Sequence, residues 1–195
     1  MSYWQGRKVL VTGAGGFIGS HLVERLVQEG ACVRAFVRYT SRGDSGLLHQ
    51  LAPDLFAHVE LVAGDVRDQA AIRSAMSGMQ TVLHLGALIA IPYSYLHPAE
   101  VVETNTIGTL NVLLAGRESG VERIVQTSTS EVYGTARYVP MGEDHPLQVQ
   151  SPYSASKIGA DMLAEAFYRS FDLPVVTLRP FNTYGPRQSA RAIVP

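Results

Sequence analysis

Six short runs of apolar, mostly β-branched residues recur along the chain, and amphipathic segments separate them. Runs that are almost continuously apolar are typical of strands buried on both faces of a parallel sheet. The candidate strands are residues 8–12, 32–37, 59–62, 81–85, 123–127 and 174–178. Their alternation with helical segments predicts a doubly wound α/β fold of the Rossmann type, with helices on both faces of one sheet.

Helix signals fill the gaps between these runs. A first helix is expected over residues 17–29, because apolar residues recur on one face and Gly30 follows as a C-terminal stop. A second is expected over 99–119. A third begins where Ser151 can cap the helix and Pro152 occupies its first position.

The chain has 195 residues, of which 46% are hydrophobic and 17% charged, so one domain over residues 1–195 is expected. Its formal net charge is -1, and lysine and arginine are nowhere concentrated. Neither nucleic acid nor an anionic membrane is therefore expected as a partner, which leaves a small molecule.

Cysteine usage and the amino-terminal residues bear on location. The single cysteine cannot form an internal disulfide, and no signal-like apolar run opens the sequence, so a cytoplasmic location is expected. The most apolar stretch, residues 85–91, is too short to span a bilayer. The six histidines show no metal-ligand spacing, so no metal site is proposed.

The first candidate strand runs directly into a glycine-rich turn. Gly13, Gly16 and Gly19 recur every three residues, with Phe17 and Ile18 at the start of the expected helix. Such glycines let the backbone approach a pyrophosphate, which then lies on the helix N-terminus. The common dinucleotide fingerprint would place its third glycine at Ile18, so this is a variant spacing. A glycine-rich turn without a ligand remains the alternative.

Residues that follow the next three strands are candidates for the rest of a dinucleotide site. Arg38 stands where NAD-binding folds usually have an acidic residue for the ribose, and its guanidinium favours the 2′-phosphate of NADP over NAD. Asp65 and Val66 are placed to bracket an adenine, and Leu85 and Ala87 to line the groove under the ribose and nicotinamide. A solvated loop arginine and ordinary packing at strand ends are the alternatives.

A constellation of four polar residues carries the chemistry. Tyr153 and Lys157 lie one helical turn apart, while Thr129 and Glu131 follow the fifth candidate strand. A phenol beside an ammonium, with a hydroxyl and a carboxylate, is suited to moving protons off a carbinol and then off carbon. The alternatives are a surface pair on the helix and a strand-end carboxylate that caps a loop.

Together these motifs resemble the extended short-chain dehydrogenase/reductases, the NAD-dependent epimerase/dehydratase family. The resemblance covers nearly the whole chain, and within the family it is to bacterial nucleotide-sugar 4,6-dehydratases, such as GDP-mannose 4,6-dehydratase and those of legionaminic-type pathways. The segments that carry it are VTGAGGFIGSHL, GDVRD, NTIGTLNVL, TSTSEVYG, SPYSASKIGAD and RPFNTYGPRQ.

The resemblance implies roles for individual residues. Tyr153, with a pKa lowered by Lys157 and the oxidised nicotinamide, would take the sugar 4-hydroxyl proton as hydride leaves C4. Thr129 would bind the same oxygen, Lys157 would also hold the nicotinamide ribose, and Asn105 would help to order the site. Glu131 would then remove the C5 proton while the C6 hydroxyl leaves, and hydride return to C6 would give a 4-keto-6-deoxy sugar nucleotide.

The resemblance also leaves alternatives open. Ser130 stands where related glucose-specific dehydratases have an acidic residue, so the acid for the departing hydroxyl is unassigned. Nucleotide-sugar decarboxylases share the Thr-Ser-Glu triplet; a 4-epimerase, a decarboxylase or a non-catalytic dinucleotide-binding module are therefore the alternatives. Pro180 is expected to support the nicotinamide, Ser130 and Asn182 to meet the substrate, and Arg187 to clamp a phosphate bidentately.

Family members continue well beyond the length of this chain, with a last core strand and a small substrate-binding domain. The chain, which lacks this C-terminal domain, is therefore expected to be the amino-terminal part of a longer enzyme. The alternative is a protein that works without the usual lid. A homodimer through the helices at residues 99–119 and 151–171 is implied by the resemblance. The sugar and the nucleotide are not identified by the sequence.

Overall fold

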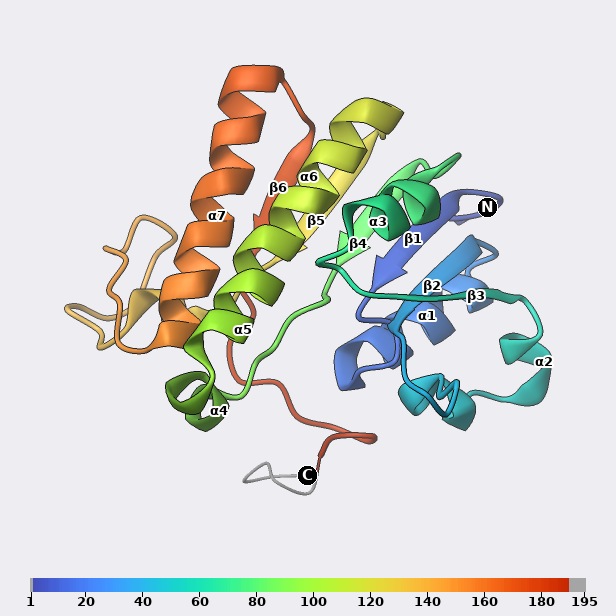
Figure 1. The fold of residues 1–195 in the computed structure, drawn as a ribbon, viewed down its shortest axis with the longest axis horizontal. Helices are drawn as coiled ribbons and strands as arrows, with labels where there is room; N and C mark the ends of the chain where they lie inside the picture. The colour runs from blue at the N-terminus through green and yellow to red at the C-terminus, as the bar shows by residue number, and fades with distance from the viewer. Residues whose placement is uncertain (1, 190–195) are drawn as a thin grey trace.

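A computed structural model describes residues 2–189 of the chain. Its six strands all run parallel in one sheet with the order β3-β2-β1-β4-β5-β6 (Figure 1). The strands are β1 Lys8–Thr12, β2 Cys32–Arg38, β3 Val59–Gly64, β4 Thr81–His84, β5 Arg123–Thr127 and β6 Val175–Leu178. The predicted doubly wound α/β fold is confirmed, and each strand lies within two residues of its predicted bounds.

Four helices of eight or more residues pack on the sheet: α1 Phe17–Gln28, α3 Gln69–Met76, α6 Gly108–Ser119 and α7 Pro152–Phe171. Shorter turns connect them. These are the 3-10 turns Gly46–Gln50 and Ser130–Tyr133, the helices α2 Pro53–Phe56, α4 Ile91–Leu96 and α5 Pro98–Val102, and a π-helical turn Glu103–Ile107.

Alternate residues of the strands enter two separate cores. Leu10 of β1 packs with α3, α6 and α7, which cover one face of the sheet (Figure 1). Val9 and Val11 point to the other face and pack against α1. Because successive side chains of a strand point to opposite faces, the buried strand β1 contributes side chains to both cores, as its continuous apolar run predicts.

The amino-terminal end of α7 follows the predicted capping. Ser151 accepts a hydrogen bond from the Ser154 backbone N–H at 3.0 Å, and the Ser154 hydroxyl accepts one from the Ser151 N–H at 3.0 Å. Pro152 fills the first helical position, where its missing N–H is not needed. This capping box fixes the start of the helix that carries Tyr153 and Lys157.

The helix expected over residues 99–119 is present, but it contains a π-helical turn that the sequence did not indicate. The structure divides this segment into α5, the π-helical turn and α6. A π-helical turn widens the helix by one residue, and such turns are frequent at functional sites. Here it contains Asn105, whose side chain reaches the loop after β4 and the start of α7.

Candidate active site

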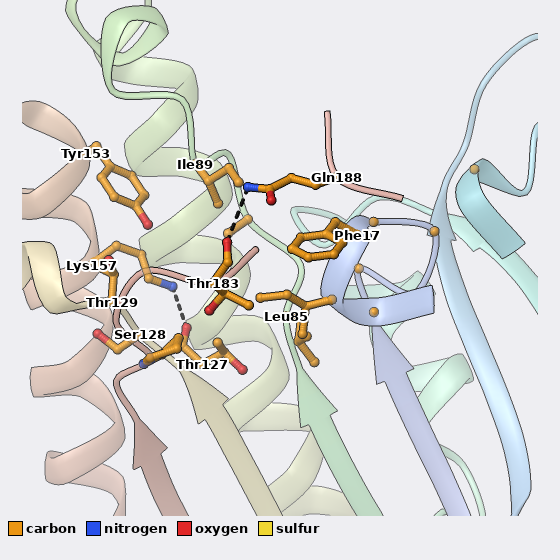
Figure 2. Close-up of a pocket in the computed structure, with 18 of the residues that line it drawn as sticks. Phe17, Leu85, Ile89, Thr127, Ser128, Thr129, Tyr153, Lys157, Thr183 and Gln188 are labelled. Atoms are coloured by element: carbon orange, nitrogen blue, oxygen red, sulfur yellow. Dashed lines mark hydrogen bonds between the residues drawn. The ribbon is translucent and has the colours of Figure 1, made fainter. Parts of the chain in front are cut away.

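The carboxyl ends of the strands open into a cavity of about 620 Å³ between the start of α1 and the start of α7 (Figure 2). Open α/β sheets bind their ligands at this end of the strands. Most of the predicted site residues line it, namely Gly13, Gly16, Phe17, Ile18, Gly19, Arg38, Leu85, Ala87, Thr129, Ser130, Glu131, Tyr153, Lys157, Pro180 and Asn182.

The glycine-rich turn forms one end of this cavity. Gly13 has a positive φ of 68°, and a Cβ there would lie 2.7 Å from the Gly86 backbone nitrogen. A Cβ on Gly19 would overlap the Gly13 carbonyl oxygen. Gly16 precedes the first residue of α1, and no side chain within residues 2–189 caps this helix. The first N–H groups of α1 therefore face the cavity, an arrangement suited to a phosphate.

A smaller cavity of about 130 Å³ adjoins the first and is lined by Asp65 and Val66. Arg38 and Ala87 line both cavities. The Asp65 carboxylate already accepts hydrogen bonds from the Arg67 guanidinium at 2.6 and 3.0 Å, and these bonds hold the pKa of Asp65 below its usual value. Asp65 and Val66, the residues expected at the adenine, thus line a different cavity from the groups around Tyr153.

Arg38 has an acidic neighbour that the sequence did not indicate. Its guanidinium lies 3.7 Å from the Glu100 carboxylate of α5, and its side chain is 64% exposed. The Tyr93 hydroxyl donates to the same carboxylate at 2.5 Å. Arg38 is therefore at the expected place, with part of its charge offset by Glu100.

Glu131 lies on the 3-10 turn that follows β5, and Thr129 immediately precedes this turn as its N-cap. The Thr129 hydroxyl accepts a hydrogen bond from the Glu131 backbone N–H at 3.2 Å, which caps the turn. The Glu131 side chain is on the exposed side of the cavity wall. The turn thus presents a hydroxyl and a carboxylate toward the helix that carries Tyr153.

Tyr153 and Lys157 are both buried on α7, with 6% and 4% exposure. The Lys157 ammonium donates a hydrogen bond to the Thr127 carbonyl at 2.7 Å (Figure 2). Burial lowers the pKa of Lys157 to about 8, while the nearby Asp161 carboxylate acts to raise it. An amine with this pKa is still mostly an ammonium at neutral pH, although it is closer to its titration point than a free lysine.

The pKa of Tyr153 differs from the expected direction. Burial raises it, and the negative charges of Glu131 and Asp161 act in the same sense, whereas a hydrogen bond with Thr129 acts to lower it. The Lys157 ammonium is directed at the strand-end carbonyl of Thr127. In this arrangement the phenol is a weaker acid than a free tyrosine, because desolvation disfavours the phenolate.

Asn105 does not line the cavity and is buried beneath it. Its amide oxygen accepts from the Leu88 backbone N–H at 2.7 Å, and its amide nitrogen donates to the Leu88 carbonyl and the Ser156 hydroxyl, each at 2.9 Å. One side chain therefore ties the loop after β4 to the first turn of α7. These hydrogen bonds support the expected role of Asn105 in ordering the site.

The structure does not bring Arg187 into the cavity. Its guanidinium pairs with the Glu24 carboxylate of α1 at 2.6 Å, and its side chain is 11% exposed. The backbone has a positive φ of 68° at this residue. As placed, Arg187 fastens the segment after β6 to α1, in contrast to the expected phosphate clamp.

Several lining residues were not predicted from the sequence. The loop after β2 folds back over the glycine turn, where the Leu47 N–H donates to the Gly15 carbonyl at 2.8 Å, and this brings Asp44 to the cavity. The segment after β6 crosses the cavity, where Gln188 donates to the Thr183 carbonyl at 3.3 Å (Figure 2). For Asp44, the irregular composition of residues 38–54 is a signal in the sequence, because binding residues are frequent in such loops.

Neither a metal site nor a membrane span is found in the described part of the chain. No three histidine, cysteine, aspartate or glutamate side chains within residues 2–189 gather closely enough to hold a metal ion. None of the helices in this range combines the length and apolar character that crossing a bilayer would require.

Comparison with known proteins identifies the family. The family model of GDP-mannose 4,6 dehydratase matches residues 10–195. The chain belongs to this family. The turn after β1, the Thr-Ser-Glu triplet and the Tyr153/Lys157 pair all fall inside the matched region.

Relatives in the GDP-mannose 4,6 dehydratase family are similar over almost the whole chain. A dTDP-glucose 4,6-dehydratase from Actinoplanes sp. is 35% identical over 193 residues, which are 96% of this chain and 60% of the relative. The solved structure of DesIV, a dTDP-glucose 4,6-dehydratase from Streptomyces venezuelae with NAD bound, has a TM-score of 0.87 and 34% identity. That match covers 96% of this chain and 59% of DesIV.

A solved 4-epimerase is equally similar in fold. The UDP-N-acetylglucosamine 4-epimerase from Methanobrevibacter ruminantium has a TM-score of 0.88 and 28% identity, with 97% of this chain and 59% of the epimerase covered. The chain therefore spans about three fifths of the length of each relative described.

Proposed function

We propose that the chain is the dinucleotide-binding and catalytic part of an NAD(P)-dependent nucleotide-sugar 4,6-dehydratase. One observation carries this proposal: Thr129, Glu131, Tyr153 and Lys157 converge on a cavity whose other end is a glycine-rich turn. For oxidation at a carbinol, the side chains that the protein must add to a bound nicotinamide are the phenol, the ammonium and the hydroxyl. The additional carboxylate supports chemistry at the neighbouring carbon.

The residues present fit a nicotinamide dinucleotide. The uncapped N-terminus of α1 offers N–H groups to a pyrophosphate, and Gly13 lets the backbone approach closely. Ile18 and Leu85 supply apolar walls toward the nicotinamide end, and Asp65 and the small adjoining cavity suit the adenine end. When bound, the dinucleotide would accept hydride from C4 of the sugar and return it to C6.

Tyr153 would accept the proton of the 4-hydroxyl, and Thr129 would donate a hydrogen bond to the same oxygen. Lys157, buried one helical turn after Tyr153 on α7, would favour the phenolate form electrostatically as the proton is taken. Its hydrogen bond to Thr127 holds the ammonium at the end of β5. These groups prepare the base and exclude water from it.

Glu131 would remove the C5 proton once C4 is a ketone, since the ketone makes that proton acidic. The C5–H electrons then form the C5–C6 double bond as the C6–O bond breaks. The two protons taken by Tyr153 and Glu131 balance the one that leaves with the hydroxyl as water and the one that C5 regains when hydride returns to C6. Among the described residues that line the cavity, Asp44 and Glu131 are the carboxylates, and Asp44 belongs to the loop after β2. Glu131 is therefore the carboxylate available at the Tyr153 end, with Ser130 and Asn182 beside it for substrate contacts.

The finer identity of the cofactor rests on Arg38. An exposed guanidinium at the end of β2 supports binding of a 2′-phosphate and hence NADP. Glu100, 3.7 Å away, opposes that preference, and DesIV was solved with NAD. We propose that the chain binds NADP through Arg38. The alternative is NAD, and a direct comparison of the binding of NADP and NAD decides between them.

The assembly is proposed to be a cytoplasmic homodimer. Exposed apolar side chains on the outer surface of α7 and the turn before α6 support a partner there, since Ile107, Met162, Tyr168 and Phe171 are each more than 40% exposed. Sedimentation at several concentrations tests the oligomeric state. A monomer at all concentrations would contradict it.

Incubation with nucleotide sugars tests the reaction. The chain, supplied with NAD or NADP, is mixed separately with GDP-mannose, dTDP-glucose, GDP-GlcNAc, UDP-GlcNAc and UDP-glucuronate, and products are followed by mass. Loss of water supports the dehydratase, whereas an isobaric isomer or loss of carbon dioxide indicates an epimerase or a decarboxylase.

Substitution of Glu131 tests its role separately. Glu131→Gln should leave the first hydride transfer intact, visible as reduced nicotinamide absorbance, but should stop elimination. Wild-type protein provides the control in the same assay. Equal loss of both steps would contradict the role given to Glu131.

A further inference from the structure

A buried carboxylate behind the active site is not used by the proposed mechanism. Asp161 lies one helical turn after Lys157 on α7 and is 2% exposed. One carboxylate oxygen, Oδ2, accepts hydrogen bonds from the Ser128 hydroxyl at 2.9 Å and from Arg179 Nε at 3.0 Å. Within the described residues, the other oxygen has no hydrogen-bond partner. A charge in such a position is retained only if its partners compensate for the lost water.

Arg179 extends this contact to the catalytic turn. It follows β6, and its Nη1 donates to the Tyr133 hydroxyl at 2.9 Å. Tyr133 is the last residue of the 3-10 turn that contains Glu131, and its ring stacks on Phe181 at a centroid distance of 6.5 Å. The carboxylate of Asp161 therefore joins α7 to the ends of β5 and β6 and, through Arg179, to the turn that presents Glu131.

Asp161 also contributes to the charge balance around Lys157. Burial disfavours the ammonium, and Asp161 is the group that acts in the opposite sense. Burial also raises the pKa of Asp161, while the hydrogen bonds from Ser128 and Arg179 and the charge of Lys157 act to keep the carboxylate ionised. Asp161 further acts to raise the pKa of Tyr153. The titratable and charged groups that face this region are Tyr153 and Asp161 on α7, His84 on β4, Glu131 on the 3-10 turn and Arg179 after β6.

We propose that Asp161 is a positioning residue of the site: its carboxylate holds the strand ends against α7 and supplies the negative charge that keeps Lys157 an ammonium beneath Tyr153. This inference rests on the proposed function, because it assigns Lys157 the charged role there. Asp161 does not line the cavity and acts through Lys157, Ser128 and Arg179.

The lysine content of the chain permits a direct test. The sequence contains two lysines, Lys8 and Lys157. Lys8 is exposed and lies at the opposite end of the sheet, at the start of β1. Lysine labelled with carbon-13 at the ε position gives one signal from each, and their titration midpoints are read by NMR as pH is raised. Lys8 thus serves as an internal reference in the same sample.

Two variants are compared with the wild type. Asp161→Asn should move the Lys157 midpoint to lower pH, because the compensating charge is lost, while the Lys8 midpoint stays unchanged. In the double variant Asp161→Asn/Arg179→Gln the site is neutral and the two amides can still hydrogen-bond. Its Lys157 midpoint should lie between those of the wild type and the single variant, since the unpaired Arg179 cation is also removed.

The outcomes separate positioning from bulk structure. A merely structural role would lower the urea midpoint of unfolding and leave the Lys157 titration unchanged, and that result would overturn the proposal. If the single variant does not fold, the double variant alone decides, because a Lys157 midpoint equal to that of the wild type contradicts the inference.

The failure of this proposal is distinct from failure of the dehydratase assignment. The lysine titration needs neither substrate nor turnover. A shifted Lys157 midpoint together with no loss of water from any nucleotide sugar would contradict the reaction only. An unshifted midpoint together with dehydration would contradict the role of Asp161 only.

Discussion

His84 provides a prediction about stability that can be worked out from its contacts. It is 2% exposed on β4, with Nδ1 2.6 Å from the Thr12 hydroxyl and Nε2 3.2 Å from the Thr109 hydroxyl. The Thr109 hydroxyl donates to the Asn105 carbonyl at 2.6 Å, so it accepts from Nε2–H, while the Thr12 hydroxyl accepts from the Gly86 N–H and donates to Nδ1. These directions fit one neutral imidazole.

Burial lowers the pKa of His84 to about 3, against 6.5 for the free side chain. Between these two values the unfolded chain binds a proton that the folded chain does not, so stability falls as pH decreases through this window. Each pH unit removes about 1.4 kcal/mol, and the whole window about 5 kcal/mol, from the free energy of unfolding. That amount is comparable to the total stability of many domains.

Urea unfolding at pH 7.5, 6.5, 5.5 and 4.5 measures this loss. The wild type should lose about 3 kcal/mol between the two extremes through His84. His84→Gln, which keeps a donor and an acceptor, should lose that much less over the same range, whatever its stability at pH 7.5. His58→Gln, the same substitution at an exposed histidine, is the matched control. Identical pH dependence of wild type and His84→Gln would refute the reasoning.

Two further predictions concern the cofactor end of the cavity. Gly19→Ala should lower the free energy of unfolding by about 1–3 kcal/mol in urea titrations and weaken dinucleotide binding, because the new Cβ overlaps the Gly13 carbonyl oxygen. Gly159→Ala, in helix α7 with its nearest neighbour a threonine methyl at 3.3 Å, should change stability by less than about 1 kcal/mol. Glu100→Gln should strengthen binding of 2′,5′-ADP relative to 5′-AMP in calorimetry, because it releases Arg38 from a counter-charge. An unchanged ratio would argue against contact between Arg38 and the 2′-phosphate.

Local patterns explain what could be predicted from the sequence. The predictions of the strands and of the first helix rest on apolar periodicity. Ser151 and Pro152 mark the start of α7, because both are local signals for a helix N-terminus. The glycine turn is equally local, because its spacing and its place after β1 are both visible in the sequence. Features of this kind depend on neighbouring residues, so one sequence is enough to find them.

What could not be predicted depends on distant partners. The π-helical turn at residues 103–107 accompanies the bonds of Asn105 to Leu88 and Ser156, and no periodicity within the segment indicates them. Arg187 has the side chain that a phosphate clamp needs. Its guanidinium instead binds Glu24, which lies 163 residues earlier in the sequence. In the sequence, Asp161 resembles an ordinary charged residue on a helix surface. Only the structure shows that Arg179, 18 residues later, binds its carboxylate.

Helix α7 carries Tyr153, Lys157 and Asp161 at successive intervals of four residues, so its register is also the register of the site. Each residue turns an α-helix by about 100°. A single inserted or deleted residue between 153 and 161 would therefore rotate one of these side chains away from its partners, whereas the irregular segment before Ser151 has no such constraint. Among relatives of this chain, we expect length variation to be frequent over residues 134–150 and absent from the first three turns of α7.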